Sequence, residues 1–385
     1  MLIRYGKKQD GKLIKKAAVY TRGEHRINSA DVDSDAVFIT GRLRANGYES
    51  YIVGGAVRDL ILGRKPKDFD IVTSATPARI KRIFHNSRII GRRFRLVHVF
   101  FGPKIFEVST FRSLKDGHTS NTYGTIEEDV LRRDFSFNAL FYDPGKQVVV
   151  DYVNGMEDIK KKRLRPIIPP ELIFRDDPVR MIRAVKYAAA TGFAIPWLLK
   201  RRIRTEASLL AEISASRLTE ELSKIIHSPY AAKIVENLEK AGLYRYLQHE
   251  ASALLKSNPG FRSRYLESLE HAEEAGDGGP LAALVRDYLD LGTPWDTLKK
   301  PEDWQAVYFD VRRFIAPMNP PRLELDKALR LIFSHHGIEL KKRVFFERER
   351  SGPRRKSGGT REEAPPAEHR RRRRRAPRPG PGETT

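Results

Sequence analysis

The stretch VGGAVRDLILGRKPKDFDIVT, residues 53–73, constrains the fold of this chain more than any other segment. The β-branched run at 51–53 predicts a strand, and apolar residues at helical spacing then predict a helix that stops near Gly63. Between them stands the pair Gly54 and Gly55, whose missing side chains let backbone N–H groups approach a ligand closely. A strand, a glycine turn and a helix start together favour an anion site. For the glycine pair alone, a plain tight turn is the simpler interpretation.

Two aspartates follow the predicted helix. Asp68 and Asp70 belong to an alternating polar and apolar run, which predicts a strand over 68–72 with both carboxylates on one face. Their repulsion is costly unless a cation lies between them. Mg²⁺ is bound by carboxylates, waters and substrate phosphates, so we interpret the pair as a metal site; a solvated edge strand is the alternative. Arg58, in the first turn of the helix, is expected to fork onto a phosphate.

These motifs resemble a known family. GGAVRD followed by DFDIVTSATP is similar to the nucleotidyltransferase head shared by bacterial poly(A) polymerases and CCA-adding tRNA nucleotidyltransferases, within the DNA polymerase β-like superfamily. The resemblance covers residues 34–222. It implies an α+β fold: a head with a small mixed or antiparallel sheet, an all-helical body and a disordered basic tail. It also implies ATP as substrate and two Mg²⁺ ions, with Mn²⁺ as an alternative, held by Asp68 and Asp70 as catalytic residues.

A third carboxylate stands in a predicted hairpin. One strand is expected to end at Phe101 and the next to span Lys104–Phe111, joined across Gly102-Pro103. Glu107 lies in the middle of the second strand, where a carboxylate is rarely buried without a partner. A structural salt bridge and a third metal ligand explain it equally well. The segment EVSTFR is similar to the family's segment at this place, which implies that Glu107 is a metal ligand.

In the run RRDFSFNAL, residues 132–140, three charged residues come before an apolar segment, and the pattern of that segment predicts a helix. It resembles a family motif whose aspartate and arginine handle the sugar and phosphates of the nucleotide. The resemblance implies a catalytic Asp134, with Arg133 and Asn138 orienting the nucleotide. A charge pair on a helix surface is the alternative, but it leaves the asparagine within an apolar stretch unexplained.

A strong helix is predicted from DDPVRMIRAV onward, with Asp177 as its cap, proline at its first position and Gly192 at its end. Arg180 and Arg183 are three residues apart and share a face. A carboxylate and two arginines on one helix edge can bind the edge of a base. The similar family motif is EDPxR, which selects the incoming base. This chain has Asp176 in place of the glutamate, so base contact by that shorter side chain is in question.

Two arginine clusters point to RNA. Arg92, Arg93 and Arg95 lie in GRRFRL, a segment similar to the one that distinguishes bacterial poly(A) polymerases from CCA-adding enzymes, and are expected to hold a primer backbone. An ordinary surface charge cluster is the alternative. After residue 351 the chain is rich in Pro, Gly and Arg and cannot bury a core, which predicts disorder. Its run of six arginines is expected to bind RNA phosphates: Arg370, Arg371, Arg372, Arg373, Arg374 and Arg375.

Length and charge agree with an RNA-binding protein of several units. The chain has 385 residues, a net charge of +23 and no cysteine, which excludes disulfides and thiolate-bound zinc. No apolar run reaches the roughly 20 residues that cross a bilayer, and the N-terminus has no signal-peptide core, so a cytoplasmic location is expected. The predicted division is a basic, mobile leader (1–33), a catalytic head (34–165), a nucleotide-recognition neck (166–230), a helical RNA-binding body (231–350) and a disordered tail (351–385).

The function predicted from the sequence is therefore that of a monomeric, template-independent poly(A) polymerase, which adds AMP from ATP to RNA 3′ ends in mRNA processing. A CCA-adding, CC-adding or A-adding tRNA nucleotidyltransferase shares the head motifs and remains the first alternative. A non-catalytic RNA-binding protein with a degenerate head is the second, although the intact aspartates disfavour it. A dinucleotide-binding oxidoreductase is disfavoured, since no GxGxxG motif follows a strand.

Overall fold

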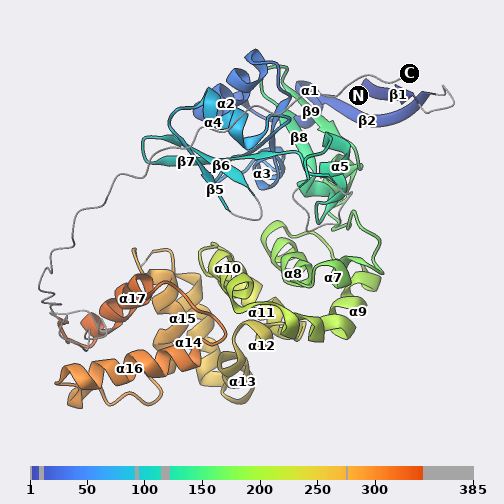
Figure 1. Cartoon of the computed structure of the whole chain (residues 1–385). Coiled ribbons are helices and arrows are strands. Elements are labelled where there is room, and N and C mark those ends of the chain that lie inside the picture. Colours follow the sequence, from blue (N-terminus) through green and yellow to red (C-terminus); the bar gives the residue numbers. More distant parts are fainter. Residues whose placement is uncertain (1, 8–12, 92–94, 114–121, 275, 341–385) are drawn as a thin grey trace, which may run out of the picture. The chain divides into compact units, whose positions relative to one another are not determined.

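The computed structural model describes residues 2–7, 13–91, 95–113, 122–274 and 276–340 (Figure 1). Within them lies a nine-stranded sheet in the order β1-β2-β9-β8-β3-β4-β7-β6-β5. Described neighbours pair antiparallel except β4 and β7, which run parallel, so the sheet is mixed. This sheet and the helices that follow it confirm the predicted α+β fold. The strands are β1 (Leu2–Lys7), β2 (Leu13–Thr21), β3 (Ser50–Val53), β4 (Asp70–Thr73), β5 (Ser87–Ile90), β6 (Leu96–Phe101), β7 (Lys104–Thr110), β8 (Leu140–Asp143) and β9 (Val148–Asp151).

The start of the chain is part of this sheet, so the prediction of a mobile leader over residues 1–33 is wrong for the described residues. β1 and β2 form an antiparallel hairpin, and β2 continues the sheet by pairing with β9, with Ala18 opposite Asp151. Ala17 and Ala18 are buried. The local pattern did not reveal these strands because the buried side chains are small and the pairing partner lies far along the chain.

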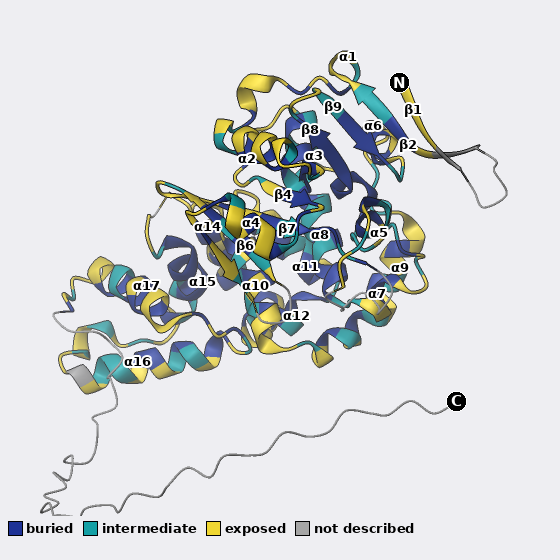
Figure 2. Cartoon of the chain, turned by 45° about the horizontal axis from the view of Figure 1, so that its top comes forward, coloured by how far each residue is buried: buried dark blue, intermediate teal, exposed yellow. Residues whose placement is uncertain are grey.

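The helices among the strands begin and end at recognisable signals. α2 (Ser34–Ala45) is capped by Asp33, whose carboxylate accepts a hydrogen bond from Asp35 N at 2.8 Å, and it ends before Gly47, which has a φ of 84°. Figure 2 shows its solvent face and the buried strands beside it. The other helical segments here are α1 (Arg22–His25), α3 (Gly55–Ile61), α4 (Pro77–Ile83), α5 (Ile126–Leu131) and α6 (Gly155–Lys160), with 3₁₀ turns at Ser29–Asp31 and Ser136–Asn138.

The central strands are packed on both faces. Ile52 and Ile71 lie opposite each other and belong to a large apolar cluster on one face, while Tyr51 and Val53 belong to a smaller cluster on the other. Burial of each such side chain contributes roughly 1.5–3 kcal/mol. In this register Val53 pairs with Asp70, so the glycine turn after β3 and the first residue of β4 meet at one end of a rigid strand pair.

Two predicted boundaries need correction. β4 begins at Asp70, so the strand predicted over 68–72 starts two residues later and Asp68 lies in the segment before it. The run after Asp134 is not an extended helix: it makes the single 3₁₀ turn Ser136–Asn138 and enters β8. β8 pairs with both β3 and β9, and this tertiary pairing overrides the local helical pattern.

The described chain is mainly helical from residue 173 to residue 335, which confirms the all-helical part of the predicted fold. α8 begins at Val179, one residue later than predicted, and ends at Gly192 with a φ of 76°. No helix in the described ranges is long and apolar enough to cross a membrane. The helices are α7 (Ile173–Asp176), α8 (Val179–Thr191), α9 (Trp197–Glu206), α10 (Ala215–Ile226), α11 (Ala231–Lys240), α12 (Tyr244–Leu247), α13 (His249–Ser257), α14 (Pro259–Glu270), α15 (Gly279–Leu289), α16 (Pro301–Phe314) and α17 (Arg322–His335).

Candidate active site

The glycine turn and the first residue of β4 form one edge of a polar pocket. Gly54 has a φ of 72°, a conformation that side chains with a Cβ rarely adopt. A Cβ at Gly54 would lie 3.7 Å from Asp70 Oδ2 and 3.9 Å from Arg133 Nη1. Gly55 follows as the first residue of α3. The turn therefore brings backbone close to both an acidic and a basic side chain of the pocket.

The predicted metal carboxylates lie close enough to influence one another. The pairing of Ile71 with Val108 places Asp70 and Glu107 side by side on β4 and β7. Desolvation by the surrounding protein, the Glu107 carboxylate and, less strongly, Asp68 raise the pKa of Asp70 to about 6, while Arg133 lowers it. The carboxylate is nevertheless accessible from the pocket side.

This carboxylate set suits a hard divalent cation, because oxygen ligands with unbalanced negative charge favour Mg²⁺ or Mn²⁺. It is not assembled as a closed cage: no group of three or more His, Cys, Asp or Glu in the described part of the chain is arranged around a metal position. Glu107 Oε1 instead lies 3.5 Å from His98 Nε2, and its side chain is 54% exposed. Of the three predicted metal ligands, Asp70 lines the pocket, whereas Asp68 and Glu107 do not.

A hydrogen-bond network fixes the residues of the RRDFSFNAL motif. Asn138 is buried; its Oδ1 accepts from Arg58 Nη1 at 3.0 Å, and its Nδ2 donates to Asp134 Oδ1 at 3.3 Å. Arg133 donates to Asp129 Oδ2 at 3.0 Å through Nη2 and to the Asn138 carbonyl at 3.3 Å through Nη1. The structure therefore brings Arg133, Asp134 and Asn138 together, as predicted.

Arg58 is placed differently from the prediction. Its guanidinium forms a two-pronged pair with Asp59, at 2.8 and 2.9 Å, in addition to its bond with Asn138. It also lies over the ring of Tyr187, 5.4 Å from the centroid. Arg58 is not among the residues that line the pocket. Its geometry is that of a support for Asn138 and not of a fork onto a phosphate.

The residues predicted to bind the base are held by ion pairs. Arg180 is buried; its Nη1 lies 2.5 Å from Asp176 Oδ2, and its Nη2 donates to the Arg132 carbonyl at 3.3 Å. Both carboxylate oxygens of Asp177 accept a hydrogen bond from Nη2 of Arg217, each at 2.9 Å. Asp176 therefore acts on Arg180, and of these two neighbouring aspartates it is Asp177 that lines the pocket.

Arg183 shares the pocket with Arg180, as their spacing predicted. Its Nε donates to Glu221 Oε1 at 2.8 Å, and Lys186 Nζ donates to Glu221 Oε2 at the same distance. Burial opposes ionisation of Glu221, but Lys186 and Arg183 more than offset it and lower its pKa to about 2.

Together these side chains surround a cavity of about 400 Å³. Several of its residues were not predicted, although three of them lie next to predicted residues: Ser109 and Arg112 in EVSTFR, and Arg132 in RRDFSFNAL. Tyr187 could also have been found, since it lies four residues after Arg183 and shares its helix face. The lining residues are Gly54, Gly55, Asp70, Ser109, Arg112, Asp129, Arg132, Arg133, Asp134, Asn138, Asp177, Arg180, Arg183 and Tyr187.

The predicted RNA contacts are only partly covered by the structure. Arg95 is exposed immediately before β6. Arg92, Arg93 and the six arginines at 370–375 lie outside the described residues, so their roles stay predictions.

Comparison with known proteins gives matches in both halves of the described chain. Residues 50–165 match the family model described as poly A polymerase head domain, and residues 192–255 match the model described as probable RNA and SrmB-binding site of polymerase A. The first match lies within residues 34–222, where the sequence resembles the family, and the second lies in the helical part of the chain.

Individual relatives fall in two groups. The chain is 42% identical over 245 residues to poly(A) polymerase I of Escherichia coli O6:H1, covering 60% of this chain and 53% of that protein. It is 36% identical over 243 residues to the CCA-adding enzyme of Geobacillus kaustophilus, covering 61% and 60%. The chain thus spans about half the length of the first of these relatives. The solved Bacillus stearothermophilus CCA-adding enzyme in complex with CTP superposes with a TM-score of 0.54 at 29% identity, covering 78% of this chain and 82% of that one.

Proposed function

Because it carries this head, the chain belongs to the nucleotidyltransferase family of bacterial poly(A) polymerases and CCA-adding enzymes, and we propose that it is a template-independent poly(A) polymerase. It adds AMP from ATP to RNA 3′ ends. The observation that carries this proposal is the pocket in which Asp70, Arg133 and Asp134 face Arg180 of α8. The higher identity to a poly(A) polymerase than to a CCA-adding enzyme supports the choice of product.

In the proposed reaction Asp68 and Asp70 would hold two Mg²⁺ ions, with Glu107 available as a further ligand. When bound, these ions would supply a lower pKa for the RNA 3′-OH and charge neutralisation for the departing pyrophosphate. The backbone at Gly54 and Gly55 approaches the triphosphate. Transfer of this kind depends on in-line positioning and charge stabilisation and needs no nucleophile from the protein.

The remaining pocket residues position the nucleotide. Arg133 and Arg183 supply positive charge toward its phosphates. Asp134 binds the ribose or acts with the metal aspartates, and Asn138 keeps its carboxylate in place through the 3.3 Å bond. Each of these groups is itself held by a hydrogen bond or ion pair, which is the preorganisation that such a site requires.

Selection of adenine is assigned to Asp177 and Arg180. Arg217 fixes the Asp177 carboxylate, and Asp176 with the Arg132 carbonyl fixes the Arg180 guanidinium. A hydrogen-bond acceptor and a donor held in this way can match the edge of one base. A different base would leave one of the two without a hydrogen-bond partner, and so would bind less well.

The proposed partners are RNA 3′ ends. Arg92, Arg93 and Arg95 hold the primer backbone, and the arginines at 370–375 add contacts without sequence preference. We further propose that the protein works as a monomer in the cytoplasm and that mRNA is among its substrates.

A CCA-adding enzyme is the second candidate, favoured by the CTP-bound structure that superposes on this chain. The deciding experiment incubates the pure protein and Mg²⁺ with each single nucleotide and either a generic RNA or a tRNA without its CCA end. Long ladders made from ATP alone on generic RNA support the proposal. Ordered addition of CTP and then ATP to tRNA only would overturn it.

A further inference from the structure

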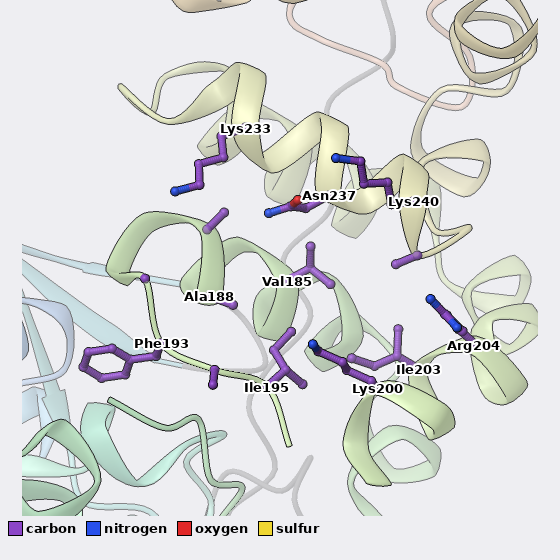
Figure 3. A pocket seen from close by; sticks show the side chains of 14 residues that line it. Val185, Ala188, Phe193, Ile195, Lys200, Ile203, Arg204, Lys233, Asn237 and Lys240 are labelled. Atoms are coloured by element: carbon purple, nitrogen blue, oxygen red, sulfur yellow. The ribbon is translucent and has the colours of Figure 1, made fainter. Parts of the chain in front are cut away.

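A second cavity, separate from the pocket above, lies between α8, α9 and α11. Its volume is about 350 Å³, within the range of small-molecule sites. Figure 3 shows Val185 and Ala188 of α8 on one side, Ile195 and Ile203 below them, and Asn237 of α11 opposite. The interior wall is therefore largely aliphatic, with one amide facing it.

Cations surround this aliphatic wall. Lys200 and Arg204 come from α9, and Lys233 and Lys240 come from α11. Lys240 pairs with Glu236 at 3.0 Å, but Lys200, Arg204 and Lys233 form no ion pair or side-chain hydrogen bond with any described residue. Among the residues that the structure describes, no acidic side chain lines the cavity. Three cations without a counter-charge around a hollow are complementary to an anion.

The two cavities lie on different faces of α8. Arg180, Arg183 and Tyr187 line the candidate active site, whereas Val185 and Ala188 line the second cavity. A ligand of the second cavity therefore has its own contacts, and it does not compete for the polar groups that hold the reacting nucleotide.

We propose that this cavity is a second nucleotide site, which takes a nucleoside monophosphate unit. The aliphatic wall covers the planar base, the Asn237 amide offers one donor and one acceptor to the base edge, and Lys200, Arg204 and Lys233 bind the phosphate. An inorganic anion would leave the aliphatic wall uncovered, and an uncharged apolar ligand would leave the cations unused. The unit is either a free nucleotide or one nucleotide of a bound RNA, since both present the same base and phosphate.

Photolabelling tests the site in the full chain. One arm uses free 8-azido-AMP, and the other uses a short RNA with one internal 8-azidoadenosine; labelled peptides are then mapped by mass spectrometry. We expect label on peptides from 185–204 or 233–241. Labelling in the first arm identifies a free-nucleotide site, and labelling in the RNA arm alone identifies a site for one nucleotide of RNA.

Two variants make the result specific. Lys200→Glu with Lys233→Glu should lower labelling of these peptides about tenfold, in the range of charge-driven association. The matched pair Lys146→Glu with Lys299→Glu, exposed lysines outside both cavities, should leave it unchanged. Ala188→Phe fills the cavity without a change of charge and should also reduce the label, with circular dichroism confirming the fold.

Label confined to the pocket around Gly54 and Asp70 in both arms would overturn the proposal, as would equal labelling of the Lys200→Glu, Lys233→Glu protein. Because the readout is binding, an inactive transferase would not produce either result.

Discussion

At the scale of residues, the candidate site depends on two groups of side chains: those that face the nucleotide, and those that hold them in place through hydrogen bonds and ion pairs. Asn138 was detectable in the sequence because an amide within an apolar run needs a partner. Its partner Arg58 was assigned to a phosphate instead, since a local pattern cannot show that α3 and the turn before β8 meet. Arg217 and Glu221 were missed for the same reason: each lies far along the chain from the residue that it holds.

Asn138→Ala tests the support. The variant removes the partner of Arg58 Nη1 and one partner of Asp134, so we expect a loss of about 1–3 kcal/mol in unfolding free energy. Nucleotide transfer should fall with it. Denaturant unfolding and primer extension measure the two effects. Asn319→Ala removes an exposed bond to Arg312 of the same kind, 2.7 Å long, and should change stability little; equal losses in both variants would refute the assigned support.

The ion pairs of Glu221 predict a dependence of stability on pH. Its pKa is about 2 in the folded protein, below the ordinary value of 4.5, so the stabilisation is complete above pH 4.5 and is lost as the pH falls toward 2. The side chain is 2% exposed, and the shift corresponds to roughly 3 kcal/mol. Urea midpoints of the wild type should therefore fall more steeply with acid than those of Glu221→Gln. Glu220→Gln, at an exposed neighbour, should follow the wild type.

At the scale of elements, predictions succeeded where a segment's own pattern determined its structure. The helix ending at Gly192 and the hairpin across Gly102 are of this kind. They failed where distant pairing decides: β2 is a strand because β9 lies beside it, and β8 is a strand because it lies between β3 and β9. These non-local pairings complete the sheet that carries the site.

Gly155, the first residue of α6, tests how elements support the site. A Cβ there would lie 2.2 Å from the carbonyl oxygen of Ser136, in the 3₁₀ turn that contains Asn138. Gly155→Ala should lower the unfolding free energy by about 1–3 kcal/mol or more, because the backbone must move to make room for the Cβ. It should also lower transferase activity. Gly41 lies within α2 with open space around it, so Gly41→Ala should raise the unfolding free energy by up to about 1 kcal/mol. Thermal unfolding of both variants measures this; a neutral Gly155→Ala would show that the turn is not tightly packed.

At the scale of the whole molecule, a net charge of +23 is the feature that most directly indicates a polyanionic partner. The charge, the head motifs and the helical pattern were all available in the sequence. The continuous apolar cluster that extends from Ile27 to Leu340 was not, since it depends on how the helices pack.

The arginines at 370–375 lie outside the described residues, and their role can be tested by salt dependence. Replacing all six with serine should reduce the slope of log affinity against log salt for single-stranded RNA by about four, at about 0.7 per charge. Fluorescence anisotropy at several salt concentrations gives the slope. Removal of residues 376–385 alone should leave it nearly unchanged, and an unchanged slope after the serine replacement would exclude these arginines from RNA binding.

Extension of a labelled RNA primer by the wild type and by Asp70→Asn, each with ATP and Mg²⁺, tests the central claim most directly. Asp70 is the carboxylate at which the glycine turn, the neighbouring acids and the proposed metal ions meet. We expect a ladder of added adenylates from the wild type and, since the metal ions lose a ligand, at least a ~100-fold slower reaction from a normally folded Asp70→Asn. A variant that extends the primer at the wild-type rate would contradict the assignment of this pocket as the site of nucleotidyl transfer.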